Sequence, residues 1–198
     1  LTAQTIYLKA NYRKEFYLAT LRYAKKEEMP LIIAEARQMG VNILPPHLVK
    51  SDNDFKFEGN DIRFGLQHIK GIAQGNLEKV TSFKRDFNNK IDVFDFAKQL
   101  GLQINVMETL FWCGAFSIDE TPRTQLSMEA RAYNLMCETQ RETVARHAVD
   151  YGYDIMATIC GLKDLKNEKG KPLLKETQLE PFRKKFKPHW KMYQHNAN

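Results

Sequence analysis

The sequence DIRFGLQHIKGIAQGNLEKVTS, residues 61–82, decides the fold predicted for this chain. Ile62 and Phe64 alternate like the end of a strand, and apolar residues then recur at helical spacing. Gly71 and Gly75 bracket a tight loop, after which an apolar helical face resumes. The stretch therefore predicts a short strand followed by a helix, a glycine hairpin and a second helix.

The predicted loop between the two helices has the features of a phosphate-binding site. The first backbone amides of a helix have no carbonyl partner within the helix, so a phosphate oxygen can accept their hydrogen bonds and meet the positive end of the helix dipole. Lys70 and Lys79 are placed to add positive charge. Two glycines at this spacing are also typical of a helix C-cap followed by a loop, so a purely structural hairpin is an alternative interpretation.

Several blocks of the sequence, in a fixed order, resemble one protein family. The block RFGLQHIKGIAQG, residues 63–75, is similar to the first helix-hairpin-helix of the C-family of bacterial replicative DNA polymerases, that of the DNA polymerase III alpha subunits, where IRFGLGAIKGVGEG is typical. Residues 1–16, LTAQTIYLKANYRKEF, resemble the late fingers segment (YQTAYLKAHYPAEF), and residues 34–46, AEARQMGVNILPP, resemble ECRRMGIEVLPPD. VFDF at residues 93–96 and TLFWCGAF at residues 109–116 follow in the order of the family's second, degenerate hairpin.

The resemblance covers residues 1–120 and implies a mainly α-helical fold with a small β-hairpin. It suggests a fingers-like helical segment at residues 1–45, followed at residues 46–120 by the β-hairpin and a tandem helix-hairpin-helix DNA-binding domain. Residues 121–198 lie beyond the resemblance. Their composition predicts a helical extension with a basic C-terminal region.

The resemblance also implies that the chain is a portion of a DNA-directed DNA polymerase, a nucleotidyltransferase of DNA replication. In this family the carboxylates that hold Mg²⁺ for nucleotide addition lie in the palm, N-terminal to the fingers. We therefore expect neither catalytic residues nor a cofactor in this chain, which would be inactive alone. The expected partners are double-stranded DNA, the remaining polymerase domains or subunit, and a sliding clamp.

The task that the resemblance implies for the hairpin is to grip the duplex backbone without reading bases. Phosphate contacts supply affinity and position but carry no sequence information. Ala73 stands where the family has the second glycine of GVG. Because alanine lacks the freedom of glycine at positive φ and adds a methyl group near the phosphate, we expect weakened or lost phosphate binding here. The expected DNA-contact residues lie on or near the loop: Arg63, Lys70, Gly71, Ile72, Ala73, Gln74, Gly75 and Lys79.

Two alternative functions belong to other classes. A free-standing helix-hairpin-helix DNA-binding or repair accessory would need no palm partner, and a helical scaffold would use its hairpins for packing only. The second helix-glycine unit, residues 92–114, carries few basic residues and is interpreted as the packing half of a paired-hairpin domain. Trp112 and Phe116 are accordingly predicted to be core residues rather than platforms for base stacking.

Composition places the chain of 198 residues, 43% of them hydrophobic, among globular proteins. No apolar run reaches the roughly 18 residues of a membrane span, and no leader sequence is recognised, so we expect no membrane association and a cytoplasmic location. The 3 cysteines are widely spaced and predict neither a disulfide framework nor a zinc site. The net charge of +6 arises within residues 163–191, which predicts either attraction to nucleic acid or an ordinary solvated tail.

Candidate catalytic and metal-binding residues are few. The sequence has no Walker loop, no zinc-protease motif and no nucleophile elbow. Asp52 and Asp54 have the spacing of alternate strand carboxylates that can hold Mg²⁺, although their turn-forming neighbours favour a structural role. His68 has no metal-ligand neighbours in the sequence and is interpreted as a surface or partly buried histidine.

The remaining elements are predicted from periodicity and from the positions of glycine and proline. Strands are expected at residues 41–44, 55–57 and 62–64, the last two joined by a four-residue connection at residues 58–61. Helices are expected over residues 12–26, 31–39, 92–100 and 104–112. In residues 1–10 the apolar positions do not decide the period, and the lack of glycine and proline allows a helix.

The C-terminal half is predicted to be helical as well. Residues 126–148 contain neither glycine nor proline, which predicts one long helix or two continuous ones. Residues 176–192 predict a final basic helical segment that Pro181 and Pro188 interrupt.

Overall fold

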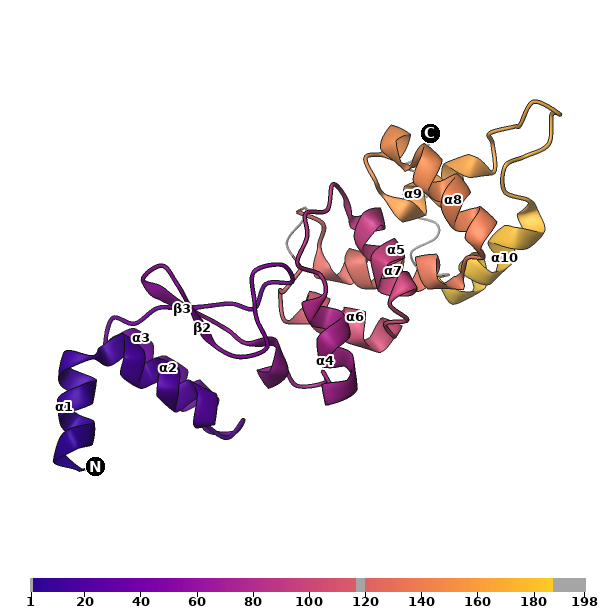
Figure 1. Cartoon of the computed structure of the whole chain (residues 1–198). Helices are drawn as coiled ribbons and strands as arrows, with labels where there is room; N and C mark the ends of the chain where they lie inside the picture. Colours follow the sequence, from indigo (N-terminus) through magenta and orange to yellow (C-terminus); the bar gives the residue numbers. More distant parts are fainter. Residues whose placement is uncertain (1, 117–119, 187–198) are drawn as a thin grey trace. The chain divides into compact units, whose positions relative to one another are not determined.

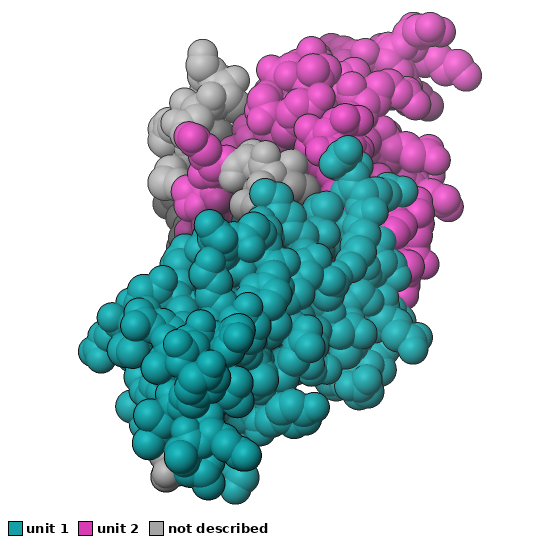
Figure 2. Space-filling model, turned by 60° about the vertical axis from the view of Figure 1, so that its left-hand side comes forward, with its two compact units in different colours: residues 1–86, 108–117 teal, residues 87–107, 118–198 magenta. Residues whose placement is uncertain are grey.

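The computed structural model describes residues 2–116 and 120–186, which form a mainly helical protein with a small three-stranded sheet (Figure 1). The predicted fold class is confirmed. In the described residues, no helix combines the length and apolar character that crossing a membrane requires. The chain divides into two compact units, coloured in Figure 2: unit 1 is residues 1–86 with 108–117, and unit 2 is residues 87–107 with 118–198. The division into the segments 1–45, 46–120 and 121–198 stays a prediction.

Unit 1 begins with three helices close to the predicted positions, α1 (Ala3–Asn11), α2 (Arg13–Tyr23) and α3 (Met29–Gln38). The side chain of Thr2 caps α1 by accepting a backbone amide of its first turn. Pro30 lies in the first turn of α3, where its missing amide costs no hydrogen bond. Gly40 follows the end of α3 with a φ of +78°, the left-handed conformation that glycine supplies after a helix.

The sheet consists of β1 (Ile43–Leu44), β2 (Lys56–Glu58) and β3 (Asp61–Arg63) in the order β1-β3-β2. β1 runs parallel to β3, and β2 pairs with β3 in antiparallel register. Because Glu58 pairs directly with Asp61, only Gly59 and Asn60 connect β2 to β3. The predicted four-residue connection is therefore wrong, and Gly59, with a φ of +61°, supplies the positive φ that a tight hairpin turn needs.

The core of the N-terminal part of unit 1 lies where α2 and α3 pack on the sheet. Tyr17 and Leu21 of α2 are fully buried together with Phe55 and Ile62 from the sheet region. The guanidinium of Arg22 donates two hydrogen bonds, of 2.7 and 3.0 Å, to the carbonyl of Phe55. These contacts fix the strands that lead into the glycine hairpin.

Unit 2 contains α5 (Lys90–Gln99), the first residues of α6 (Ile104–Trp112), and the C-terminal helices. Of the one long helix or two continuous ones predicted over residues 126–148, the structure has two helices, because Met136 and Cys137 have extended backbone with ψ of 141° and 168°. The C-terminal helices are α7 (Arg123–Leu135), α8 (Glu138–His147), η2 (Ala148–Tyr151), α9 (Ile155–Leu162) and α10 (Glu176–Lys185).

The final helix departs from its prediction at Pro181. Pro181 lies inside α10, which continues to Lys185, so the expected interruption there is wrong. Arg183, Lys184 and Lys185 occupy its last turn, where positive charge complements the negative end of the helix dipole. Pro188 and the rest of the predicted basic segment lie outside the described residues.

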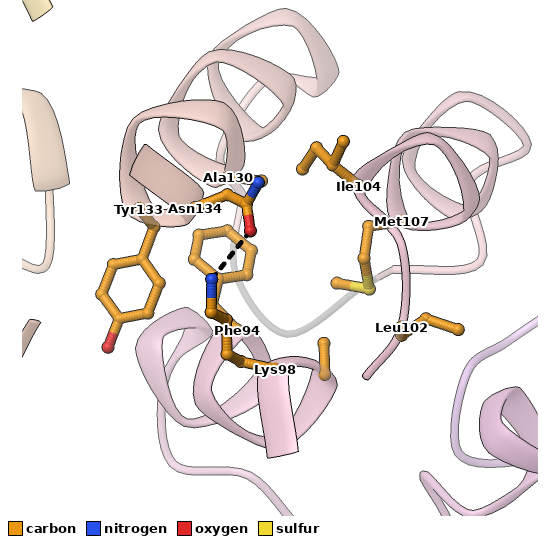
Figure 3. A pocket seen from close by; sticks show the side chains of 9 residues that line it. Phe94, Lys98, Leu102, Ile104, Met107, Ala130, Tyr133 and Asn134 are labelled. Atoms are coloured by element: carbon orange, nitrogen blue, oxygen red, sulfur yellow. Dashed lines mark hydrogen bonds between the residues drawn. The ribbon is translucent and has the colours of Figure 1, made fainter. Parts of the chain in front are cut away.

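A small cavity of about 30 Å³ lies where α5, α7 and the start of α6 meet (Figure 3). Phe94, Met107 and Tyr133 are among the side chains that surround it. The ammonium of Lys98 donates a 3.0 Å hydrogen bond to the side-chain oxygen of Asn134 at its edge. A volume of this size is close to that of a single water molecule, so this cavity offers no room for a larger ligand.

A buried ion pair is the principal polar contact in the interior of unit 2. The Lys90 ammonium lies 2.8 Å from Oε2 of Glu129, and both side chains are almost completely buried. Oε1 of Glu129 accepts further hydrogen bonds from the Gln125 amide and the Ile155 backbone amide, and Lys90 also donates to Thr121. The pair thereby connects α5 to α7 and to the start of α9.

We expect the stability of unit 2 to fall as the pH rises towards neutrality, by way of Glu129. Burial raises the pKa of Glu129 to about 7 from its ordinary value of 4.5, against the opposing effect of Lys90. Since the folded chain then binds this proton more tightly than the unfolded chain, the contribution is fully present below about pH 4.5 and is lost as the pH passes 7. The shift corresponds to roughly 3 kcal/mol.

The measurement is the free energy of unfolding of the wild-type chain minus that of the Glu129→Gln variant, followed between about pH 5 and about pH 8. The wild-type chain should lose stability relative to the variant across this range, because glutamine does not titrate. A difference that stays constant would mean that Glu129 remains ionised throughout and that the Lys90 charge outweighs the effect of burial.

Candidate nucleic-acid interface

The glycine hairpin follows β3 directly and differs from its prediction in two places. The predicted first helix is a single 3-10 turn, η1 (Leu66–His68), because the backbone becomes extended at Ile69 with a ψ of 123°. Gly75, predicted to lie in the loop, is in the first turn of α4 (Gln74–Thr81). The loop is therefore residues 69–73, and Gly71, with a φ of +100°, makes its reversal.

Buried apolar side chains anchor the hairpin in the core, while its loop faces solvent. The buried residues recur on both sides of the loop: Leu66, Ile69, Ile72, Leu77 and Val80. The exposed residues lie between them: Lys70, Gly71, Ala73, Gln74 and Gly75. The alternation of buried and exposed positions holds the backbone of the loop at the surface.

The exposed part of the hairpin carries a cluster of available backbone donors. In the part of the chain that the structure describes, the amides of Gly71, Ala73, Gln74 and Gly75 donate to no acceptor. The next amide, that of Asn76, donates to the Ala73 carbonyl at 2.9 Å and closes the first turn of α4. Donors of this kind at the positive end of a helix dipole are suited to an anion such as a phosphate.

Ala73 does not impair the hairpin in the way that the sequence suggested. It is the N-cap residue of α4 with a φ of −76° and a ψ of 154°, a conformation open to any residue. The position therefore does not require positive φ, and the expected weakening of phosphate binding stays a prediction. The Ala73 side chain also makes no capping hydrogen bond, which leaves the amides of the first turn available.

The two predicted lysines occupy different places. Lys70 is exposed at the loop itself, and in the described residues it forms no ion pair. Lys79 is partly exposed and lies in the last turn of α4, away from the amide cluster along the helix. Of the two, only Lys70 lies on the loop beside the free amides.

The structure places Arg63 in the interior rather than at the loop. Its side chain is only 8% exposed, and the guanidinium forms a bidentate ion pair with Glu58 in which both hydrogen bonds are 2.7 Å. A third hydrogen bond, also 2.7 Å, reaches the Pro45 carbonyl. Arg63 lowers the pKa of Glu58 and joins β3 to its neighbours, and its proposed contact with DNA stays a prediction.

The two aspartates of the candidate Mg²⁺ site have structural partners. Asp52 forms ion pairs with Lys56 and Lys84. Oδ1 of Asp54 lies 2.8 Å from Nε2 of the partly buried His68 and accepts the backbone amide of Phe55. Among the described residues no group of three or more histidine, cysteine, aspartate or glutamate side chains could hold a metal ion.

Gly65 brings the hairpin into direct contact with the strand region. A Cβ atom at Gly65 would lie 2.4 Å from the carbonyl carbon of Asp54, closer than side chains ever approach a backbone. Next to it, the amides of Leu66 and Gln67 donate 2.9 Å hydrogen bonds to the carbonyls of Asp52 and Asn53. The position of the loop thus depends on a glycine that the sequence argument did not single out.

Trp112 is the residue whose burial the sequence argument misjudged. Its predicted role as a core residue is wrong, because 52% of its surface is exposed, whereas Phe116 is buried as predicted. Leu110 and Phe111, its neighbours on α6, point into the core instead. The helical register places Trp112 outside despite the general preference of tryptophan for the interior.

Comparisons with known proteins match the part of the chain that contains this hairpin. A family model described as a helix-hairpin-helix motif matches residues 40–126. DNA polymerase III subunit alpha of Saccharopolyspora erythraea is 35% identical over 63% of this chain, that of Chlamydia pneumoniae is 30% identical over 89%, and that of Aquifex aeolicus is 34% identical over 62%. The matched regions span only 11%, 15% and 11% of the lengths of these relatives.

The close approach at Gly65 leads to a prediction about stability with a matched control. Replacing Gly65 with alanine should destabilise unit 1 by about 1–3 kcal/mol, because the added methyl meets rigid backbone. Replacing Gly75, which has open space around its Cβ position and lies in a helix, should stabilise the chain by roughly 0.5–1 kcal/mol. Chemical denaturation followed by circular dichroism measures both, and a Gly65→Ala variant as stable as the wild type would contradict the constraint.

Proposed function

Since this chain is homologous to a segment of the DNA polymerase III alpha subunits and carries a helix-hairpin-helix motif, we propose that it is the part of a DNA-directed DNA polymerase that holds duplex DNA by its backbone. The hairpin of residues 69–75 contacts phosphates, and it reads no bases. Such contacts position a duplex while leaving its sequence unread, as a replicative enzyme requires.

The proposal rests on the cluster of available amides beside Lys70. Gly71, Ala73, Gln74 and Gly75 present backbone donors to solvent, and the start of α4 adds the positive end of its dipole. Lys70 adds a full positive charge at the same loop. Backbone donors and a lysine suit a phosphate, which is anionic and identical at every nucleotide, better than they suit the edge of a base.

The partners and the chemistry of the whole enzyme belong to the same proposal. Nucleotide addition with Mg²⁺ is assigned to a palm, and no step of it is assigned to a residue of this chain. The remaining polymerase domains and a sliding clamp are the other proposed partners. A free-standing DNA-binding accessory would bind duplex DNA in the same way without a palm, and a scaffold would not bind it at all.

The first test is the affinity of the chain for a labelled duplex, measured by fluorescence anisotropy across a salt series. For binding through phosphates, the logarithm of the association constant falls linearly with the logarithm of the salt concentration, with a slope of about −0.9 for each phosphate neutralised. Lys70→Ala should lower the affinity and reduce the slope by about 1. Lys70→Glu combined with Lys79→Glu should lower the affinity further.

Lys26→Ala is the matched control, because Lys26 is an exposed lysine of the same unit that lies outside the hairpin. It should leave the salt slope within error of the wild type. Equal effects of Lys26→Ala and Lys70→Ala would show that the charge acts without a defined site, and unchanged binding by the double glutamate variant would refute the hairpin as the contact.

A second prediction separates phosphate binding from folding. Aspartate in place of Ala73 supplies the missing N-cap of α4 and should raise the free energy of unfolding by about 0.5–2 kcal/mol. The same carboxylate occupies amides of the first turn and repels phosphate, so the affinity for duplex DNA should fall while stability rises. Ala73→Ser caps the helix without the charge and should lower the affinity less. Unchanged affinity of the aspartate variant would mean that these amides do not meet the DNA.

A further inference from the structure

A groove of about 480 Å³ lies in unit 1 between the hairpin and the C-terminal end of α6. Its size falls within the roughly 300–1,000 Å³ typical of small-ligand sites. Among the described residues, no aspartate or glutamate lines it. The lining residues are Pro46, Phe64, His68, Ile69, Lys70, Thr109, Trp112 and Cys113.

The groove combines an accessible aromatic ring with a positive charge. Trp112 lines it and is 52% exposed, an unusual exposure for so large an apolar side chain. Phe64 and Ile69 contribute further apolar surface, and Lys70, which belongs to the same loop as the free amides, contributes a positive charge. An aromatic surface beside a cation at a phosphate-binding loop is a combination that neither core packing nor duplex-backbone binding requires.

We propose that this groove receives one unpaired nucleotide of a DNA strand, with its base stacked on Trp112 and its phosphate at Lys70. The inference rests on the proposed function for the identity of the ligand as DNA, and it adds a second mode of contact. Every base has a π-face, so stacking on an aromatic side chain holds an unpaired nucleotide without selecting its sequence.

Charge favours a nucleotide over an apolar peptide as the occupant. A peptide side chain could cover Trp112, but it would leave the Lys70 ammonium without a counter-charge. A nucleotide satisfies both, because its base is aromatic and its phosphate is anionic. The lining residues that the structure describes include no carboxylate, so none of them repels a phosphate.

A base inside a duplex is covered on both faces and cannot stack on a side chain, so the groove acts only where a strand is unpaired. The two modes of binding are therefore separable by experiment. The hairpin amides and Lys70 serve any phosphate, whereas Trp112 matters only for an unpaired base. The affinity for blunt duplex DNA should depend on Lys70 and should not change when Trp112 is replaced.

The test compares a labelled oligothymidylate with an oligomer of the same length that contains abasic deoxyribose phosphates. The wild-type chain should bind the oligomer with bases more tightly, and Trp112→Ala should remove that preference with a loss of about 5- to 150-fold in affinity. Trp112→Phe should retain most of the preference. Tyr23→Ala is the matched control, because Tyr23 is an exposed aromatic residue outside the groove.

A second readout does not require a change at Trp112. The chain has 2 tryptophans, so the Trp190→Phe variant reports the fluorescence of Trp112 alone. Oligothymidylate should quench it, and the abasic oligomer should not. This measurement also covers the case in which Trp112→Ala fails to fold.

The outcomes distinguish the two proposals. Equal quenching by both oligomers, or an unchanged base preference in Trp112→Ala, overturns the nucleotide groove while leaving Lys70-dependent duplex binding intact. If the wild-type chain does not bind duplex DNA, the proposed function itself is refuted. Dimerisation in sedimentation experiments that Trp112→Ala abolishes would assign the groove to a second copy of the chain and overturn the inference.

Discussion

The glycine at position 65 is the constraint on which the arrangement of unit 1 depends. A Cβ atom at this position would lie 2.4 Å from the carbonyl carbon of Asp54, so only glycine allows the hairpin to pack this closely against that backbone. The two backbone hydrogen bonds beside it, from Leu66 and Gln67, hold η1 against the strand region. The hydroxyl of Ser51 adds a 2.8 Å hydrogen bond to the Phe64 carbonyl. These contacts attach the loop to the sheet and thereby set the direction in which its backbone amides point.

Unit 2 is organised around a different interaction, the buried pair of Lys90 and Glu129. A buried charge pair is a poor source of net stability, because desolvation opposes the Coulomb attraction, but removal of one partner leaves the other uncompensated. The additional hydrogen bonds from Gln125 and Ile155 complete the surroundings of the carboxylate. The pair therefore serves to specify how three helices meet, and its burial, rather than any reactive role, accounts for the raised pKa of Glu129.

The two proposed contacts with DNA use separate physical properties of one surface region. Backbone amides and Lys70 address charge, which every nucleotide presents, and Trp112 addresses the π-face, which only an unpaired base presents. Both contacts leave the sequence unread. Ala73, which seemed a loss by comparison with a glycine pattern, is compatible with the first contact because its φ is negative and its methyl group does not compete for the amides.

The sequence by itself determined the class of fold, most helix positions and the place of the hairpin. Periodicity, a helix-starting residue such as Pro30 and a helix-ending residue such as Gly40 are local signals, and local sterics act in the same way in any fold. The resemblance was carried by motifs that are contiguous in the chain, so it too could be read without a structure. The 3-10 turn at Leu66–His68 was not predicted, and the sequence did not decide between one helix and two around Met136, because nothing in the local pattern opposes a longer helix at either place.

Only the tertiary structure decided which side chains face solvent. The charge of Arg63 suits a DNA contact, yet the structure buries it. The large apolar side chain of Trp112 suits a core, yet the structure exposes it. Glu58 and Pro45 surround the guanidinium from separate segments, and the register of α6 turns Trp112 outward. Burial is a property of the surroundings that distant segments create, and a residue's own chemistry supplies only a preference that packing can override.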